Sequence, residues 1–303
     1  MSLPEPGSSA PSPQASAPSG GAHEARRKAL RRFFGNKLGV AGAVIVVGFI
    51  LMAIFAPYLA PFDPAEQSLL NRRQAPNATY WLGTDEFGRD ILSRIIYGAR
   101  VSLGVALGSV GIGLIVGSTA GAIAGYVGGA VDTLVMRVMD LLLAFPYLLL
   151  AIVIVSALGP GMTNTIIAIA VWTVPAFARV ARSAVLQIKE RDFVVAALAL
   201  GAKEQRVMRV HLLPNFGATL VVYASLYLAY AILMESALSF LGLGVQPPRA
   251  SWAGMISNGR NYLTAAPHIA TIPGVAIALA VLGFNLLGDA IRDVYDPRAT
   301  RDG

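Results

Sequence analysis

The stretch GAKEQRVMRVHLLPNF, residues 201–216, places a short charged run inside a chain that is otherwise strongly apolar. Its ionisable residues are Lys203, Glu204, Arg206, Arg209 and His211. Residues 141–178 before it hold no charged side chain, and another apolar segment follows from 216 to about 240. Segments of that length and composition are typical of membrane-spanning helices. We therefore expect the charged stretch to connect two spans outside the hydrocarbon layer.

The composition of the whole chain supports a membrane protein. Of its 303 residues, 55% are hydrophobic and only 14% are charged, whereas soluble domains hold about 25% charged residues. The net charge of +7 fits loops rich in Lys and Arg, since no aromatic-basic motif indicates nucleic acid binding. The chain has no cysteine, which excludes disulfides and thiol chemistry.

Six segments of spanning length predict an all-α integral membrane fold, a six-transmembrane-helix bundle. Residues 157–164, ALGPGMTN, divide the long uncharged stretch 141–178 into two spans, because Gly and Pro interrupt helices. The predicted spans are 38–60, one inside 101–131, the two halves of 141–178, 216 to about 240, and about 269–288.

The distribution of Lys and Arg predicts the orientation. With the N-terminus in the cytoplasm, 17 of the 24 Lys and Arg residues lie inside and seven outside. Both termini are therefore predicted to be cytoplasmic. The predicted segments are a disordered Pro/Ser-rich tail (1–25), a basic segment and first span (26–60), an external loop with an interfacial helix (61–97), a five-helix core (98–290) that includes a cytoplasmic loop (182–215), and a cytoplasmic tail (291–303).

Small residues form a seam along the second predicted span. Its glycines are Gly104, Gly108, Gly113, Gly117, Gly121 and Gly125. Four of them recur at steps of four, so on a helix they allow another backbone to approach closely. The seam indicates either a tightly packed core helix that moves during function or ordinary helix packing. Both alternatives imply an assembly of several helices.

Charged residues near the predicted spans are candidates for function, because charges inside a membrane are costly. They are Asp132, Arg137, Asp140, Glu235 and Asp289. Arg137 and Asp140 are three residues apart, so we expect them to pair on one helix face. Glu235 is the most interior, and we expect it to line a gate or pore, or to cap a neighbouring helix. In the external loop, Thr84 or Asp85 is expected to cap the interfacial helix.

The loop around the opening stretch predicts three helical pieces. The first, 179–189, extends the fourth span. The second, DFVVAALAL at 192–200, has Asp192 as its expected N-cap and ends at Gly201 in a left-handed turn. The third ends before Pro214, which disfavours helix at the preceding residue. Physical chemistry alone leaves two interpretations: a short helix that fits a groove on a partner, or a helix on a lipid surface.

Residues 195–215, VAALALGAKEQRVMRVHLLPN, resemble the EAA loop of bacterial ABC-importer permeases. That pattern is Glu-Ala-Ala, three residues, Gly, nine residues, and Ile-x-Leu-Pro. The positions in register are Ala196, Ala197, Gly201, Leu213 and Pro214. Val195 stands where the family usually has Glu. His211 stands at the Ile position, as is usual in the peptide-importer branch.

The resemblance extends over residues 33–298. The segments 81–103, 139–161, 235–248 and 285–298 are similar to the C-type permease subunit of dipeptide, oligopeptide and nickel importers. This resemblance implies a helix bundle in the bacterial inner membrane, a pore shared with a second homologous permease, and an external solute-binding protein. It also implies two cytoplasmic ATPase subunits, which bind ATP and Mg²⁺ and contact the permeases at their EAA-like coupling loops. The residues it assigns to that loop are Asp192, Val195, Ala196, Ala197, Gly201, His211, Leu213 and Pro214.

No residue set in the sequence predicts catalysis or a bound cofactor. The histidines His23, His211 and His268 are scattered, and the phosphate-binding loop GxxxxGK[ST] is missing. The leading interpretation is an ATP-driven importer subunit for peptides or a related solute. The alternatives are a stand-alone gradient-driven secondary transporter, with Glu235 and Asp140 as proton sites, and a membrane scaffold. Peptide, nickel and glutathione importers share these motifs.

Overall fold

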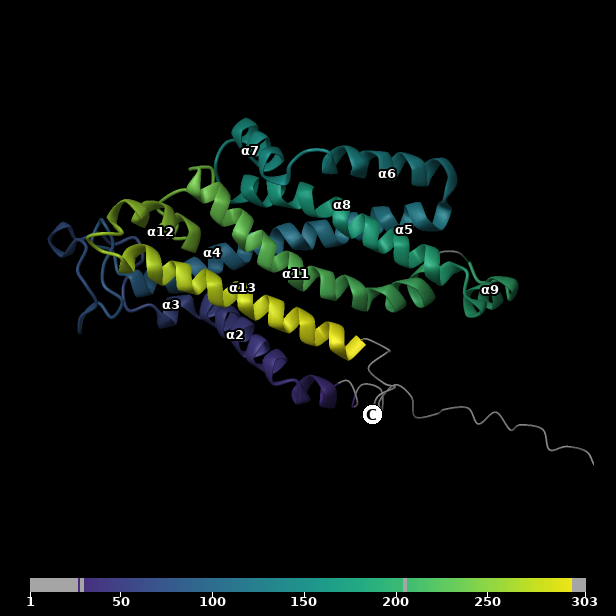
Figure 1. The fold of residues 1–303 in the computed structure, drawn as a ribbon, viewed down its shortest axis with the longest axis horizontal. Coiled ribbons are helices and arrows are strands. Elements are labelled where there is room, and N and C mark those ends of the chain that lie inside the picture. Colours follow the sequence, from purple (N-terminus) through teal and green to yellow (C-terminus); the bar gives the residue numbers. More distant parts are fainter. Residues whose placement is uncertain (1–26, 28–29, 204–205, 296–303) are drawn as a thin grey trace, which may run out of the picture.

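The computed structural model describes residues 27, 30–203 and 206–295 and consists of long helices that run side by side (Figure 1). Its α-helices are α2 (Lys37–Ile54), α3 (Ala56–Leu59), α4 (Ile91–Ile112), α5 (Ser118–Val127), α6 (Gly129–Leu143), α7 (Tyr147–Leu158), α8 (Met162–Lys189), α9 (Asp192–Ala199), α11 (Leu213–Phe240), α12 (Trp252–Gly259) and α13 (His268–Tyr295). The structure also contains two π-helical segments, η2 (Gly113–Gly117) and η3 (Val207–Leu212), and two 3₁₀ turns, η1 (Leu69–Asn71) and η4 (Arg260–Tyr262). Among the described residues, β pairing is limited to one isolated bridge, between Thr84 and Asp90.

The structure confirms the predicted all-α bundle with five helices that can each span a membrane and a sixth span that is broken. The five are 37–54, 91–127, 162–189, 216–240 and 268–294. The broken span consists of α6 and α7, which are bent by 88° relative to each other. The predicted tail 1–25 and residues 296–303 lie outside the described residues. α13 continues to Tyr295, so it includes the first residues of the predicted C-terminal tail.

The third span differs from the prediction. It begins at Gly129 rather than near residue 141, and it turns sharply after Leu143. Pro146 explains the turn, because proline has no N–H to donate and disfavours helix at the residue before it, Phe145. The charged residues of this region therefore lie along α6 itself rather than at the mouth of a continuous span.

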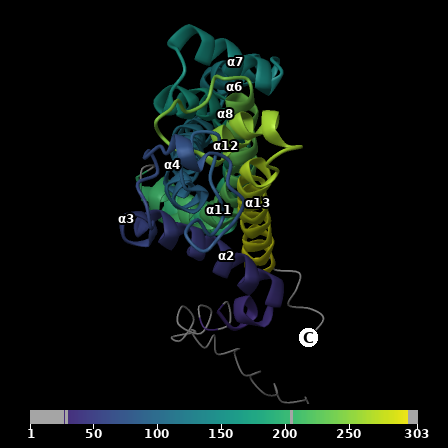
Figure 2. The same ribbon diagram turned by 90° about the vertical axis from the view of Figure 1, so that its left-hand side faces the viewer.

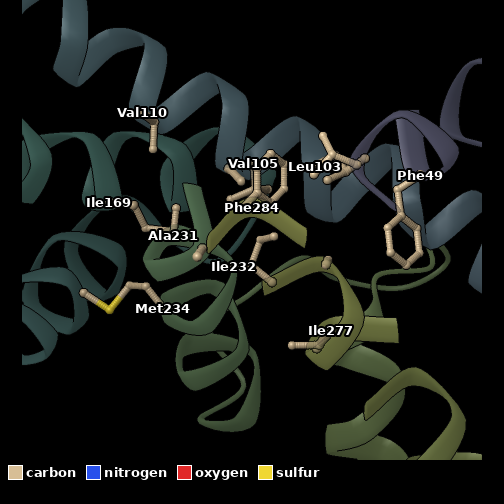
Figure 3. Close-up of a cluster of buried hydrophobic side chains, with 14 of the residues drawn as sticks. Phe49, Leu103, Val105, Val110, Ile169, Ala231, Ile232, Met234, Ile277 and Phe284 are labelled. Atoms are coloured by element: carbon tan, nitrogen blue, oxygen red, sulfur yellow. The ribbon is translucent and has the colours of Figure 1, made fainter. Parts of the chain in front are cut away.

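The helices form a bundle from α2 at one edge to α6 and α7 at the other (Figure 2). α13 packs against α2 and α11, while α8 packs against α4, α5, α6 and α7. Figure 3 shows the buried side chains where α4, α8, α11 and α13 meet, including Val105, Ile169, Ile232 and Phe284. In a membrane, close van der Waals packing of such side chains, rather than their removal from water, holds these helices together in the core that they share.

The predicted glycine seam is present, and all of its glycines face α8. A Cβ atom at Gly113, Gly117 or Gly121 would overlap Thr173, the carbonyl of Val174 or the carbonyl of Ala178, respectively. At Gly125 it would lie 2.9 Å from the carbonyl oxygen of Arg182. The two backbones therefore touch over about three helical turns, which confirms close packing.

We predict that Gly121→Ala destabilises the bundle by about 1–3 kcal/mol, the usual cost of overpacking. The added methyl group would meet backbone atoms of Ala178, which cannot rotate away. The measurement is the thermal unfolding midpoint of the purified protein in detergent. Gly111→Ala is the matched control, because a Cβ there meets no atom within 4 Å. Equal midpoints for the two variants would contradict the seam's role.

Candidate functional site

The segment 192–214, which we call the crossing segment, projects from one end of the bundle, opposite α12 (Figure 1). It connects the ends of two long helices, α8 and α11, and its own helix α9 packs against α8 and η3. Val194, Val207 and Leu212 are fully buried. The crossing segment is therefore anchored to both long helices by apolar contacts rather than attached as a loose loop.

The predicted N-cap of α9 is wrong by one residue. Arg191 holds the extended backbone of an N-cap, although its side chain makes no capping bond, and Asp192 is the first helical residue. Asp192 is exposed in the first turn. A carboxylate at this place still interacts favourably with the positive end of the helix dipole.

The predicted left-handed turn at Gly201 is present. Its φ angle is +84°, and two backbone bonds close the end of α9: Gly201 N–H donates to Leu198 O at 2.9 Å, and Ala202 N–H to Ala197 O at 3.0 Å. This bond pair is the Schellman motif. Because a Cβ at Gly201 would meet no atom within 4 Å, only the backbone conformation requires glycine there.

The predicted helix end before Pro214 is wrong. The chain stays helical from the π-helical segment η3 directly into α11, and Pro214 lies in the first turn of α11. The wider π turns relieve the clash between the proline ring and the backbone of the preceding turn, so the helix continues through Pro214. His211 lies within η3 by its backbone; its side chain falls outside the described part of the structure.

The outer surface of α9 is apolar and shallow. Val195 is 54% exposed, Leu198 41% and Leu200 88%. Ala196 is exposed and Ala197 is half-buried, so small side chains separate the larger ones. Clustered exposed apolar side chains are typical of an interaction surface.

Three polar contacts join α8 to the α5–α6 hairpin just before the crossing segment. Arg182 forms two bonds to Asp132, at 2.5 and 2.6 Å, and Arg179 bonds Asp140 at 2.7 Å. Lys189 Nζ donates to the carbonyl of Gly125 at 3.1 Å. The predicted pairing of Asp140 with Arg137 is therefore wrong.

Sequence reasoning missed these ion pairs for a specific reason. The partners lie 39 and 50 residues apart, and only the antiparallel packing of α6 on α8 brings them together. The acidic residues on α6 were visible in the sequence, but their partners were assigned to a separate cytoplasmic extension.

Glu235 lies inside the bundle and is fully buried. The hydroxyls of Ser102, on α4, and Ser251, the N-cap of α12, are directed at its carboxylate. Among the described residues, however, neither carboxylate oxygen completes a hydrogen bond of good geometry. Glu235 thus lies where α4, α11 and α12 meet. Within the described part of the chain it caps no helix, because its carboxylate accepts no hydrogen bond of good geometry and Ser251 is the N-cap of α12. Its role in a gate or pore stays a prediction.

Comparison with known protein families identifies the family of this chain. A family model described as "Binding-protein-dependent transport system inner membrane component" matches residues 117–301, more than half of the chain. The chain belongs to this family. A second model, the N-terminal TM domain of oligopeptide transport permease C, matches residues 25–76 of the permease.

The permease has close curated relatives. It is 47% identical over 298 residues to the dipeptide transport system permease protein DppC of Alkalihalophilus pseudofirmus, covering 98% of the permease and 96% of the relative. It is 41% identical to the glutathione transport system permease protein GsiD of Pectobacterium atrosepticum, covering 90% and 91%. A solved structure of the MetNI methionine ABC transporter in inward facing conformations shares the fold, with a TM-score of 0.55 at 19% identity, covering 67% of the permease and 97% of that chain.

These findings confirm the predicted class. The permease is a multi-pass membrane protein, a C-type transmembrane subunit of an ABC importer, and not an enzyme. The alternatives of a stand-alone secondary transporter and of a scaffold are set aside. Asp140, one of the proton sites that the secondary-transporter alternative invoked, is paired with Arg179.

The loop between α3 and α4 contains a buried charge cluster rather than the predicted interfacial helix. Asp90, not Thr84 or Asp85, caps α4 by accepting a bond from Ser93 N–H at 2.8 Å. Asp85 instead folds the preceding turn, because its side chain accepts bonds from the N–H groups of Phe87 and Arg89. It also pairs with the guanidinium of Arg89 at 2.6 Å.

Glu86 completes this cluster, and its environment makes the stability of the permease depend on pH. Its carboxylate is buried and lies 3.3 Å from Arg89. Burial, followed by the charge of Asp85, raises the pKa of Glu86 above the ordinary value of 4.5. The folded state therefore binds this proton more tightly than the unfolded state, and its stability falls as the pH rises from 4.5 through the folded-state pKa.

We predict that Glu86→Gln raises the thermal midpoint of the purified permease at neutral pH, because it removes the cost of a buried charge. The difference from wild type should shrink as the pH falls below 4.5, where the wild-type carboxyl is protonated in both states. Glu66→Gln, at an exposed position of the same loop, is the matched control. Parallel curves for Glu86→Gln and wild type would refute the assignment.

Proposed function

We propose that the permease imports short peptides and that the crossing segment receives the work of ATP hydrolysis from cytoplasmic ATPase subunits. The curated relatives are named for dipeptide and glutathione transport, and both solutes are short peptides. The observation that carries the coupling role is the apolar surface of α9, which is exposed beyond the ends of the spanning helices, while α9 itself packs against α8 and η3.

The proposed assembly contains this permease, a second homologous permease, two ABC ATPase subunits and an extracytoplasmic solute-binding protein. Both termini and the crossing segment lie in the cytoplasm of a bacterial cell, and the spans cross the inner membrane. ATP and Mg²⁺ bind to the ATPase subunits, so this chain needs no cofactor of its own. The binding protein docks at the opposite end, where the charge cluster and α12 lie.

The proposed coupling proceeds through rigid contacts. When the ATPase subunits close on ATP, they displace α9, which lies in a groove between their lobes. The Schellman turn and the buried Val194 transmit this displacement to η3 and α8. The ion pairs on α8 carry it to α6, so the bundle shifts between inward-open and outward-open states.

Val195 changes the expected chemistry of this contact. The family's usual Glu would make a polar or ionic contact with the ATPase, whereas Val195 offers an apolar side chain that is half exposed in the isolated chain. We propose that the ATPase groove for this permease is correspondingly apolar around Val195. The contact then gains its free energy mainly from burial of apolar surface.

Co-purification tests the assembly directly. Leu200→Asp should weaken binding of the ATPase subunits at least about tenfold, because a carboxylate would replace an apolar side chain that the contact buries. The second permease should still co-purify from native membranes. Leu70→Asp is the matched control, since Leu70 is 95% exposed in η1, which lies in the loop between α3 and α4.

One outcome would overturn the proposal. If wild-type permease purifies without ATPase subunits and transports solute alone in liposomes, the crossing segment has no coupling role.

We predict that Gly201→Val uncouples ATP hydrolysis from transport. A β-branched residue in the left-handed conformation costs about 1–2 kcal/mol, so the turn would shift and α9 would lose its fixed orientation. Gly201→Asn should retain most transport, because asparagine tolerates this conformation. The measurement is peptide uptake per ATP hydrolysed in proteoliposomes.

Gly217→Val serves as the control for adding the same side chain nearby. Gly217 lies in α11, and a Cβ there meets no atom within 4 Å. Normal coupling in Gly201→Val would show that the turn's geometry is unimportant.

A further inference from the structure

A hollow of about 270 Å³ lies between α7, α8 and α11. We call it the aromatic hollow, because Tyr147, Trp172 and Tyr230 line it together with aliphatic residues such as Leu233 and Met234. All of its lining residues are uncharged. We propose that the aromatic hollow forms part of the solute path and contacts the uncharged side chains and peptide groups of a passing peptide. This inference rests on the proposed peptide import.

The rings form a continuous chain across the three helices. The centroids of Tyr147 and Trp172 are 5.4 Å apart, those of Trp172 and Tyr227 are 5.4 Å apart, and those of Tyr227 and Tyr230 are 6.1 Å apart. These distances are those of interacting aromatic pairs. The hollow therefore has a wall of fixed aromatic faces, with phenol and indole groups that can also hydrogen-bond.

The aromatic hollow lies deep between the helix ends. Trp172 follows Met162, the first residue of α8, by ten residues, and Tyr230 precedes Phe240, the last residue of α11, by ten. At 1.5 Å per residue, each lies about 15 Å from its helix end, which is half of a hydrocarbon layer about 30 Å thick. Tyr and Trp usually gather at the membrane interfaces. Their concentration at this depth indicates that they face something other than lipid.

The broken third span supports the same conclusion. The chain leaves helical geometry between Leu143 and Tyr147, and Phe145 and Tyr147 are 54% and 53% exposed. Irregular backbone at membrane depth is tolerated only where protein buries it or where it lines a water-filled cavity. Because the surface here is concave, the structure favours a water-filled path over a flat contact with another helix.

The chemistry of the lining sets the class of ligand. Aromatic faces and phenol hydroxyls match peptide groups and apolar or aromatic side chains, whereas the charged termini of a peptide find no counter-charge among the lining residues. A path needs contacts weak enough for the solute to leave. The aromatic hollow should therefore favour peptides with large apolar side chains without holding them tightly.

Cysteine labelling tests whether the aromatic hollow is water-filled. The natural chain has no cysteine, so Tyr230→Cys and Val47→Cys each place one thiol in it. Both positions are about half exposed in the isolated chain, but Val47 lies on α2 at the opposite edge of the bundle. The probe is a charged, membrane-impermeant methanethiosulfonate applied to the assembled importer in proteoliposomes, and the readout is the mass of this chain.

We expect Tyr230→Cys to react at least about tenfold faster than Val47→Cys, and excess phenylalanyl-phenylalanine to slow that reaction during turnover. Equally slow reaction at both positions would overturn the proposal, because the hollow would then face lipid or the second permease. The comparison of the two labelling rates does not depend on which solute the importer carries.

Transport selectivity tests the contact with solute. Trp172→Ala should lower uptake of phenylalanyl-phenylalanine several-fold more than uptake of alanyl-alanine, while Phe34→Ala, at a 69% exposed position before α2, should change neither. An equal loss of both peptides in Trp172→Ala would indicate a structural role and overturn the proposed contact. If the wild-type importer carries neither peptide, the proposed function fails, and contact of the aromatic hollow with peptides fails with it. The labelling result then decides separately whether the hollow is part of a water-filled path.

Discussion

The close approach of α8 to the helix formed by α4, η2 and α5 is the constraint on which the rest of the bundle depends. Four glycines lie at this contact, and because they have no side chain the two backbones can touch. A side chain added between the two backbones would force the helices apart. α8 therefore acts as the reference body of the structure, and α6 and α7 take their positions from it.

That constraint also explains why the crossing segment is well placed to transmit force. α8 enters the segment from a region fixed by glycine packing and by ion pairs to Asp132 and Asp140. α11 leaves it as one continuous helix of 28 residues. A displacement of α9 would thus reach both α8 and α11. If the two helices then move by different amounts, the bundle can change between its inward-open and outward-open states.

The sequence predicted the features that depend on neighbours along the chain. Periodic glycines gave the seam, Gly201 gave the left-handed turn, and apolar length gave the spans, because each follows from local geometry. The sharp turn at Pro146 was available to the same reasoning, but the long uncharged run around it masked the signal. The bonds of Arg182 and Arg179 were not predictable, since they depend on how two distant helices pack. The π turns before Pro214 were missed because a proline in a helical pattern can either end the helix or be accommodated by a local change of geometry. Only the tertiary contacts of η3 decide which of the two occurs.

The buried carboxylate of Glu235 has a consequence for how the protein is made. Its neighbour Ser102 precedes it in the chain by more than 130 residues, whereas Ser251 follows it. During synthesis from the N-terminus, α11 therefore enters the membrane with one of its two hydroxyl neighbours already in place and the other still to be translated. Until α12 folds back, this acidic side chain depends on α4 alone.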